Sequence, residues 1–151
     1  MVVDPSGQFL YVGNTFGSGT ISAFAIDHVD GTPTPVIGSP FATGVGPRSL
    51  CVDPSGKLLF AGTFGDGKVS GYTIGSSGGL TPIGSSPFAV GIGILGVAVD
   101  PSAKFLYVVD NSPGSVRTLS IGSSGALTPI AGSPFSAGAG TEAVVVTAKI
   151  Q

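Results

Sequence analysis

The sequence predicts an all-β fold made of β-propeller blades: three four-stranded antiparallel meanders that form an incomplete ring. One observation is a turn-and-strand motif that starts at Asp4, Asp53 and Asp100, so that its copies are 49 and 47 residues apart. A period of this length is typical of solenoids and propellers. A second observation is that each copy continues into further short apolar runs separated by Gly-rich turns, with no 3.6-residue periodicity. Four short antiparallel strands repeated in tandem are typical of propeller blades.

The composition indicates a packed chain with few charges. Hydrophobic residues make up 42% of the 151 residues and charged residues 9%, with 26 Gly and 12 Pro. So much Gly and Pro indicates disorder only where no apolar pattern accompanies it, and here the apolar residues recur in register. The net charge of −2 leaves no basic patch for phosphates, so nucleic acid is not an expected partner. No 18-residue apolar run exists, so no membrane-spanning helix is expected.

No metal site and no cofactor are expected from the residue types. The single Cys51 excludes an internal disulfide and a multi-cysteine metal site, and its apolar surroundings favour a small buried hydrophobe over a nucleophile. His28 lies between Asp27 and Asp30 in an expected turn. One imidazole with two flexible carboxylates is typical of a solvated turn rather than of a metal cluster.

The second repeat shows how each blade is expected to be built. Residues 49–52 form an apolar run suited to a buried inner strand, and a Pro- and Gly-containing turn at 53–56 follows it. A second strand is expected over 58–62 and a third over 68–74. Residues 80–90 contain two prolines, which cannot donate to a β-ladder, so this outer strand belongs at the sheet edge.

The same plan fits the rest of the chain. Blade one is expected over 2–43, blade two over 46–90 and blade three over 94–137. The second, third and outer strands are expected at 9–13, 20–26 and 33–43 in blade one, and at 105–109, 115–121 and 127–137 in blade three. Residues 1–4 supply only the end of an inner strand, and residues 141–148 are expected to form an extra inner strand with no blade after it.

Three blades are too few to close a ring, because propellers typically have at least four. Two arrangements are open: the chain is the C-terminal piece of a larger propeller, or copies of it self-associate through their open blade edges. The partial strand at the start favours the first arrangement.

Three sequence motifs carry a family resemblance: Asp-Pro-Ser-Gly-x-Phe-Leu-Tyr-Val-x-Asn, Gly-Thr-Ile-Ser-x-Phe-x-Ile and Leu-Thr-Pro-Ile-x-Gly-Ser-Pro-Phe. Together they make essentially the whole chain resemble the lactonase-type seven-bladed propellers, which include 6-phosphogluconolactonases and are related to the YVTN-repeat proteins. The resemblance implies a lactone-handling pocket and carboxylic-ester hydrolysis in carbohydrate metabolism. Enzymes of that family often read Gly-Pro-Arg-His where this chain has Gly46-Pro47-Arg48-Ser49, and they often carry a Glu after the Asn that ends the second strand.

Antiparallel strand order places several polar residues on one face of the blades. Arg48 and Glu142 take equivalent positions at the start of inner strands, beside the central channel. Arg48 is expected to hold an anionic substrate by a forked contact, and Glu142 or Asp110 to activate water. Asn14 and Asn111 are expected to help bind the substrate. The alternative is that Arg48 pairs with a neighbouring carboxylate and that the Asn and Asp side chains stabilise the Gly-rich turns.

Two functions follow from these expectations. One is hydrolysis of a small-molecule lactone by water attack, which the matched positions of Arg48 and Glu142 favour. The other is a non-catalytic propeller that binds an unknown protein partner as an extracytoplasmic scaffold, which the departures from the family motif favour. Low charge and abundant Gly, Ser and Thr favour a periplasmic or secreted location over a cytoplasmic one.

Overall fold

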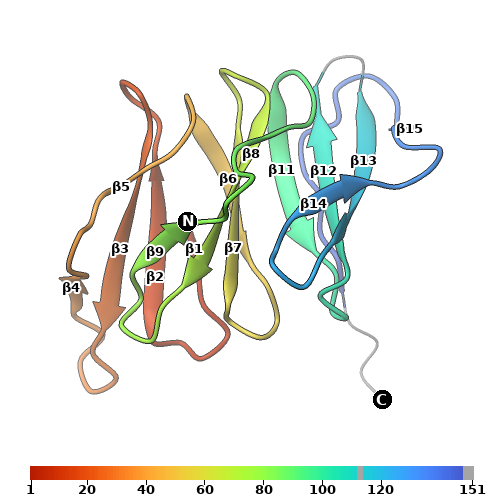
Figure 1. Cartoon of the computed structure of the whole chain (residues 1–151). Helices are drawn as coiled ribbons and strands as arrows, with labels where there is room; N and C mark the ends of the chain where they lie inside the picture. The colour runs from red at the N-terminus through yellow and green to blue at the C-terminus, as the bar shows by residue number, and fades with distance from the viewer. Residues whose placement is uncertain (112–113, 148–151) are drawn as a thin grey trace.

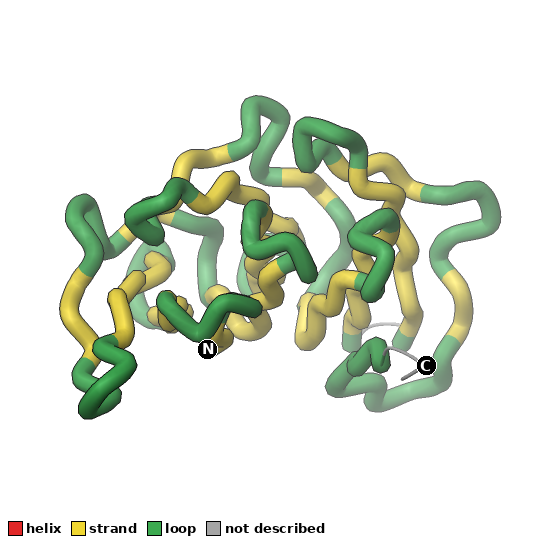
Figure 2. The backbone as a smooth tube through the Cα atoms, turned by 90° about the horizontal axis from the view of Figure 1, so that it is seen from below, coloured by secondary structure: helices red, strands yellow, loops and turns green. Residues whose placement is uncertain are grey.

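The computed structural model describes residues 1–111 and 114–147. In this part of the chain the strands form three antiparallel sheets and there is no helix. Figure 1 shows the sheets side by side, and Figure 2, seen from below, shows that they are arranged as an open fan. The predicted all-β blades in an incomplete ring are confirmed.

Blade two shows the common plan. From the inside outward it consists of β6 (Pro47–Val52), β7 (Leu58–Thr63) and β8 (Lys68–Ile74). The edge is formed by β9 (Leu80–Pro82) and β10 (Phe88–Ala89), which both pair with β8. The proline-bearing segment is therefore the edge, as predicted, but it forms two short strands instead of one, because prolines interrupt the ladder that a continuous strand would need.

Blades one and three repeat this order. Blade one contains β1 (Val2–Val3), β2 (Phe9–Asn14), β3 (Thr20–Ile26), β4 (Pro33–Pro35) and β5 (Phe41–Ala42). Blade three contains β11 (Ile94–Val99), β12 (Phe105–Asp110), β13 (Ser115–Ile121), β14 (Leu127–Pro129) and β15 (Phe135–Ser136). The third strands β3, β8 and β13 have the predicted bounds, and the second strands β2, β7 and β12 each run one residue further.

The core consists of two apolar layers, one between each pair of neighbouring blades. Leu59 and Ala61 of β7 belong to the layer shared with blade one, whereas Phe60 belongs to the layer shared with blade three. This alternation follows from the two-residue period of a strand that has a sheet on each side. As a result β7 is the most buried strand of blade two, and the inner strand β6, expected to be buried on both faces, is partly exposed.

Each Asp-Pro-Ser turn is held by its aspartate. One carboxylate oxygen of Asp4, Asp53 and Asp100 accepts a 2.7 Å hydrogen bond from the backbone N–H five residues later, and the other accepts from the neighbouring serine. Burial raises the pKa of Asp4 and Asp100, but the hydrogen bonds from Ser6 and Ser102 and from backbone N–H groups outweigh it, so both pKa values lie below the ordinary range. The ionised carboxylates thus stabilise the turns.

Two tyrosines join neighbouring blades. The fully buried Tyr11 donates to the Gly78 carbonyl at 3.1 Å, from blade one to blade two, and Tyr72 donates to the Ala42 carbonyl at 2.7 Å in the opposite direction. Burial, with a smaller effect of the Asp4 charge, raises the pKa of Tyr11 to about 12. The buried hydroxyl therefore stays protonated and remains a donor.

The extra inner strand expected over 141–148 is not formed in residues 141–147, and residue 148 lies outside the described residues. The segment still lies against blade three, because a Cβ placed on Gly96 of β11 would lie 3.2 Å from the Val144 nitrogen. In blades two and three, by contrast, the inner strand pairs with the second strand that follows it.

Candidate functional site

The candidate site lies on the face that carries the turns between second and third strands. These turns, together with the connections that enter β6 and β11, lie at the upper edge of the sheets in Figure 1. We call this the upper face. The Asp-Pro-Ser turns lie on the opposite, lower face.

Arg48 is positioned by a β-bulge. In the β6–β7 ladder Pro47 pairs with Thr63 and Ser49 with Gly62, so Arg48 is the extra residue. Bulges are enriched beside active sites, where they redirect a side chain. The exposed Arg48 guanidinium lies 5.4 Å from the centroid of the Phe64 ring, a cation–π contact with the turn after β7.

Arg48 and Phe64 line a cavity of about 490 Å³ on the upper face. Its other lining residues are Thr15, Val45, Gly46 and Gly65. The walls therefore come from the turn after β2, the connection into β6 and the turn after β7. A cavity with one cation, one aromatic ring and one hydroxyl suits a small anionic ligand with an apolar or sugar-like face.

Asn111 lies along the same face, one blade further. Its backbone N–H donates to the Gly93 carbonyl at 3.2 Å. A Cβ on Gly93 would lie 3.4 Å from the Phe64 ring and 3.9 Å from the Asn111 Cβ, so Gly93 separates these two side chains. The structure thus brings Arg48, Phe64 and Asn111 into one row, with the Asn111 side chain exposed.

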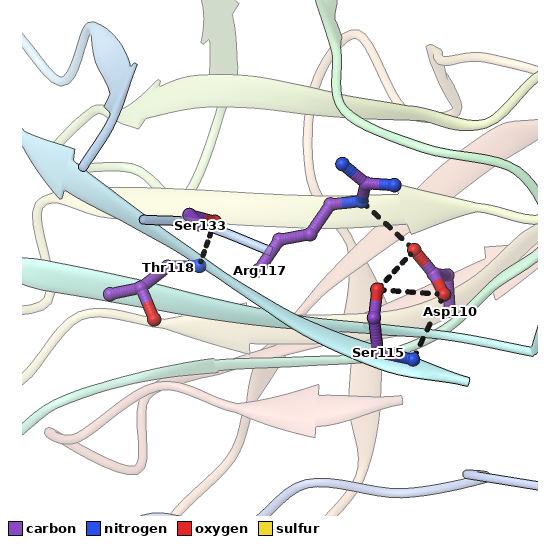
Figure 3. A network of polar contacts seen from close by, with 5 residues as sticks. All are labelled: Asp110, Ser115, Arg117, Thr118 and Ser133. Carbon is purple, nitrogen blue, oxygen red and sulfur yellow. Dashed lines mark hydrogen bonds and ion pairs between the residues drawn. The ribbon is translucent and has the colours of Figure 1, made fainter. Parts of the chain in front are cut away.

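Two of the predicted site residues hold their own blades together. Asn14 donates through Nδ2 to the Thr20 and Ser22 hydroxyls, both at 2.9 Å. The fully buried Asp110 accepts from the Ser115 hydroxyl at 3.0 Å with both oxygens and from Arg117 Nε at 2.9 Å (Figure 3). These contacts correspond to the alternative in which Asn and Asp side chains stabilise the turns.

Glu142 is exposed on the segment after blade three. It follows Arg48 and Leu95 at successive 47-residue intervals. Leu95, like Arg48, is the extra residue of a β-bulge, between Ile94 and Gly96 in the β11–β12 ladder. Residues 141–147 form no strand, so Glu142 is not held in a β-ladder as the residues beside Arg48 are.

Sequence reasoning missed Phe64, Thr15 and the bulge. The available signal was an aromatic residue inside each of the first two Gly-rich turns, Phe16 and Phe64, at positions where a folding role does not require one. Phe16 is 95% exposed and Phe64 41% exposed, so neither contributes a buried core side chain.

A larger cavity, about 610 Å³, lies elsewhere, on the lower face between blades two and three. Its lining combines Lys57 with Leu58, Thr73 and Ile121 and contains no carboxylate or imidazole to activate water, so we place the candidate site at Arg48. Residues 1–111 and 114–147 contain no group of three or more His, Cys, Asp or Glu side chains placed to hold a metal ion. The same residues include no helix long and apolar enough to cross a membrane.

Comparisons with solved structures agree with this architecture. The chain is similar to a candidate 6-phosphogluconolactonase from Bacteroides fragilis, with 22% identity, a TM-score of 0.80 and coverage of 91% of this chain and 38% of that chain. A second candidate 6-phosphogluconolactonase, from Bacteroides uniformis, gives 19% identity and a TM-score of 0.81 over 91% and 40% of the two chains. The periplasmic gluconolactonase PpgL of Pseudomonas aeruginosa gives 19% identity and a TM-score of 0.77 over 93% and 40%.

At these identities the structures show a shared fold. The chain spans about two fifths of the length of each of them. No curated protein matches the sequence. The sequence model of the family described as "Lactonase, 7-bladed beta-propeller" matches residues 1–94, which is more than half of the chain. The chain therefore belongs to the lactonase family of seven-bladed β-propellers.

Proposed function

We propose that this chain contributes the upper face of a lactone hydrolase that acts on a sugar lactone carrying an anionic group. The observation that carries the proposal is the geometry of Arg48, which a bulge redirects and the Phe64 ring supports at the wall of a 490 Å³ cavity. In the proposed site the guanidinium holds the anionic group of the substrate by two parallel hydrogen bonds. Membership of the lactonase family supports the lactone as substrate class.

The proposed reaction is water attack on the lactone carbonyl. The Glu142 carboxylate takes a proton from water while the water oxygen forms a bond to the carbonyl carbon. The bond between that carbon and the ring oxygen then breaks, and the ring oxygen takes this proton from Glu142 to become the hydroxyl of the hydroxy acid, which restores the carboxylate. Asn111 donates to the sugar, whereas Asp110 is left out because both its oxygens already accept hydrogen bonds.

We place this activity outside the cytoplasm. The low charge of the chain and its similarity to a periplasmic gluconolactonase support this placement. Fractionation of the producing cells tests it, and recovery of the protein with cytoplasmic enzymes alone would contradict it.

The test is hydrolysis of glucono-δ-lactone and its 6-phosphate by the wild-type chain and by Arg48→Ala, Glu142→Gln and Lys57→Ala variants. Loss of Arg48 raises KM for the phosphorylated lactone about tenfold or more, since a hydrogen bond to a charged group contributes roughly 1.5–3 kcal/mol, and it affects the neutral lactone less. Loss of the Glu142 carboxylate lowers kcat by about 100-fold or more. Lys57→Ala, on the lower face, matches the wild type.

The binding of a lactone without hydrolysis is a second candidate function. The observation that favours it is the engagement of Asp110, which leaves the row of Arg48, Phe64 and Asn111 without a carboxylate. Calorimetry separates the two. Lactone binding that Arg48→Ala removes, with no turnover above the spontaneous rate, supports the binding protein and eliminates the hydrolase. If the wild-type chain shows no binding and no turnover, both candidate functions are eliminated.

A further inference from the structure

Blade three contains a charged pair where its sister blades contain neutral ones. The residue that ends the second strand is Asn14 in blade one, Thr63 in blade two and Asp110 in blade three. The residue at the third position of the third strand is Ser22, Ser70 and Arg117. Asn14 and Ser22 form a direct hydrogen bond at 2.9 Å, so the blade fold does not require a charged pair at these two positions.

The charged pair in blade three is partly enclosed. Asp110 is fully buried and the Arg117 side chain is 26% exposed. Placing charges in such surroundings costs desolvation energy, and a neutral pair of similar shape often serves stability equally well. The connection from blade two passes over the pair at Gly91, where a Cβ would lie 2.8 Å from Arg117 Nε and 3.1 Å from Asp110 Oδ2.

Only one edge of the Arg117 guanidinium is used by Asp110. Nε donates to the carboxylate, and no contact is drawn from either terminal amino group to Asp110 (Figure 3). Within the part of the chain that the structure describes, neither terminal amino group forms a hydrogen bond. The ion pair with Asp110 fixes the guanidinium plane and leaves the terminal amino groups as a preorganised fork of donors.

Arg117 lines a cavity of about 280 Å³ between blades two and three. The other lining residues are mostly apolar: Ala89, Val90, Leu119, Pro129 and Ser133. Ser133 accepts from the Thr118 N–H at 3.1 Å, so its hydroxyl hydrogen remains to donate to a ligand. The corresponding cavity between blades one and two has Ser70 in place of Arg117 and includes the carboxylate of Asp66, so it lacks the cation and repels an anion.

We propose that this cavity binds a small monocarboxylate with a short apolar chain. The planar carboxylate matches the fork of Arg117, and the chain packs against Val90, Leu119 and Pro129. Because Asp110 already offsets the charge of Arg117, a singly charged ligand is favoured over a doubly charged one. The site is separate from the Arg48 cavity, with which it shares no lining residue, and it does not depend on the proposed lactone hydrolysis.

The test is titration of the full chain with butyrate, benzoate and inorganic phosphate, followed by NMR of the arginine Nε–H resonances and by calorimetry. The wild type binds butyrate and benzoate in the millimolar range, with saturable shifts of the Arg117 resonance, and binds phosphate at least about tenfold more weakly. The double variant Asp110→Asn with Arg117→Ser copies the neutral pair of blade one, so it folds, and it loses the binding.

Two comparisons make the test decisive. Arg48→Ala removes the other exposed fork and keeps carboxylate binding, whereas Arg117→Lys keeps the charge but not the fork and weakens binding at least about tenfold. Unchanged butyrate binding in the folded double variant, absence of binding in the wild type, or phosphate binding as tight as butyrate binding would each overturn the proposal.

Discussion

Cys51 shows how the environment of one residue decides its chemistry. Its side chain packs against the apolar layer between blades two and three. Burial, with a smaller effect of the Asp53 charge, raises the pKa of the thiol to about 12. Since the thiolate is the reactive form, the folded chain holds this cysteine in an inert state near neutral pH.

We therefore expect Cys51 in the folded chain to react with iodoacetamide at pH 8 about 100-fold or more slowly than in the chain unfolded by guanidinium, where the thiol pKa returns to roughly 8.5. Mass spectrometry of timed samples measures both rates. Equal rates, with folding verified by circular dichroism, would show that the thiol is not shielded.

The Asp110–Arg117 pair shows what a sequence can and cannot reveal about a single residue. The turn-and-strand motif that starts at Asp100 predicts that Asp110 ends a strand on the upper face, and the structure agrees. Whether its carboxylate is free depends on the strand register, in which Val108 faces Arg117 and Asp110 is a diagonal neighbour. Asn14 and Ser22 have the same diagonal relation, which becomes visible only once the register is known.

A repeated glycine joins each blade to the connection that leaves it. Gly19, Gly67 and Gly114 precede the third strands with φ of +79°, +65° and +86°. A Cβ on them would lie 2.1, 1.9 and 2.0 Å from the carbonyl oxygens of Gly44, Gly91 and Gly138. Both the left-handed backbone and the close approach require glycine at this position.

We expect Gly67→Ala to lower the free energy of unfolding by roughly 2–4 kcal/mol, because it combines left-handed strain with a clash against backbone. The matched control is Gly79→Ala, where nothing lies within 4 Å of an added Cβ. Urea denaturation followed by circular dichroism measures both variants. Equal stabilities would show that the connection shifts without cost.

Some elements of the fold can be predicted from the sequence and others cannot. The third strands were predicted to the residue, since turn residues bound them on both sides. The outer strand was predicted as one continuous strand, but the structure has two short strands, β9 and β10. The point where the ladder breaks depends on which backbone N–H groups of the segment face β8. The bulges at Arg48 and Leu95 were not predicted, because one extra residue in a strand leaves no mark on an apolar run.

At the scale of the whole molecule, the outward face of blade one is apolar, and no strand among residues 1–111 and 114–147 packs on it. Val3 faces Leu10, and Leu10 faces Phe24, in one row across β1, β2 and β3. This row lies on the side of the sheet opposite Tyr11 and Ile21, which pack toward blade two. Val3 is 49% exposed, and Leu10 and Phe24 are only half-buried.

Self-association of the 151-residue chain therefore stays a prediction, and the row of Val3, Leu10 and Phe24 is the surface through which we expect it. We expect sedimentation velocity to show dimers or larger species whose share grows with concentration, and Phe24→Ser to shift them to the monomer. Val29→Ser, at a 96% exposed turn position, serves as the control. A wild-type monomer at every concentration would contradict the expectation.

The bulges at the entrances of β6 and β11 each hold one side chain outside the ladder. The residue that bulges takes no part in the flanking register pairs, so arginine and leucine both occur there without disturbing the ladder. Selection, or a protein engineer, can therefore exchange this one side chain in blade two and in blade three independently. The upper face then carries two exchangeable side chains, at positions 48 and 95, on an unchanged scaffold.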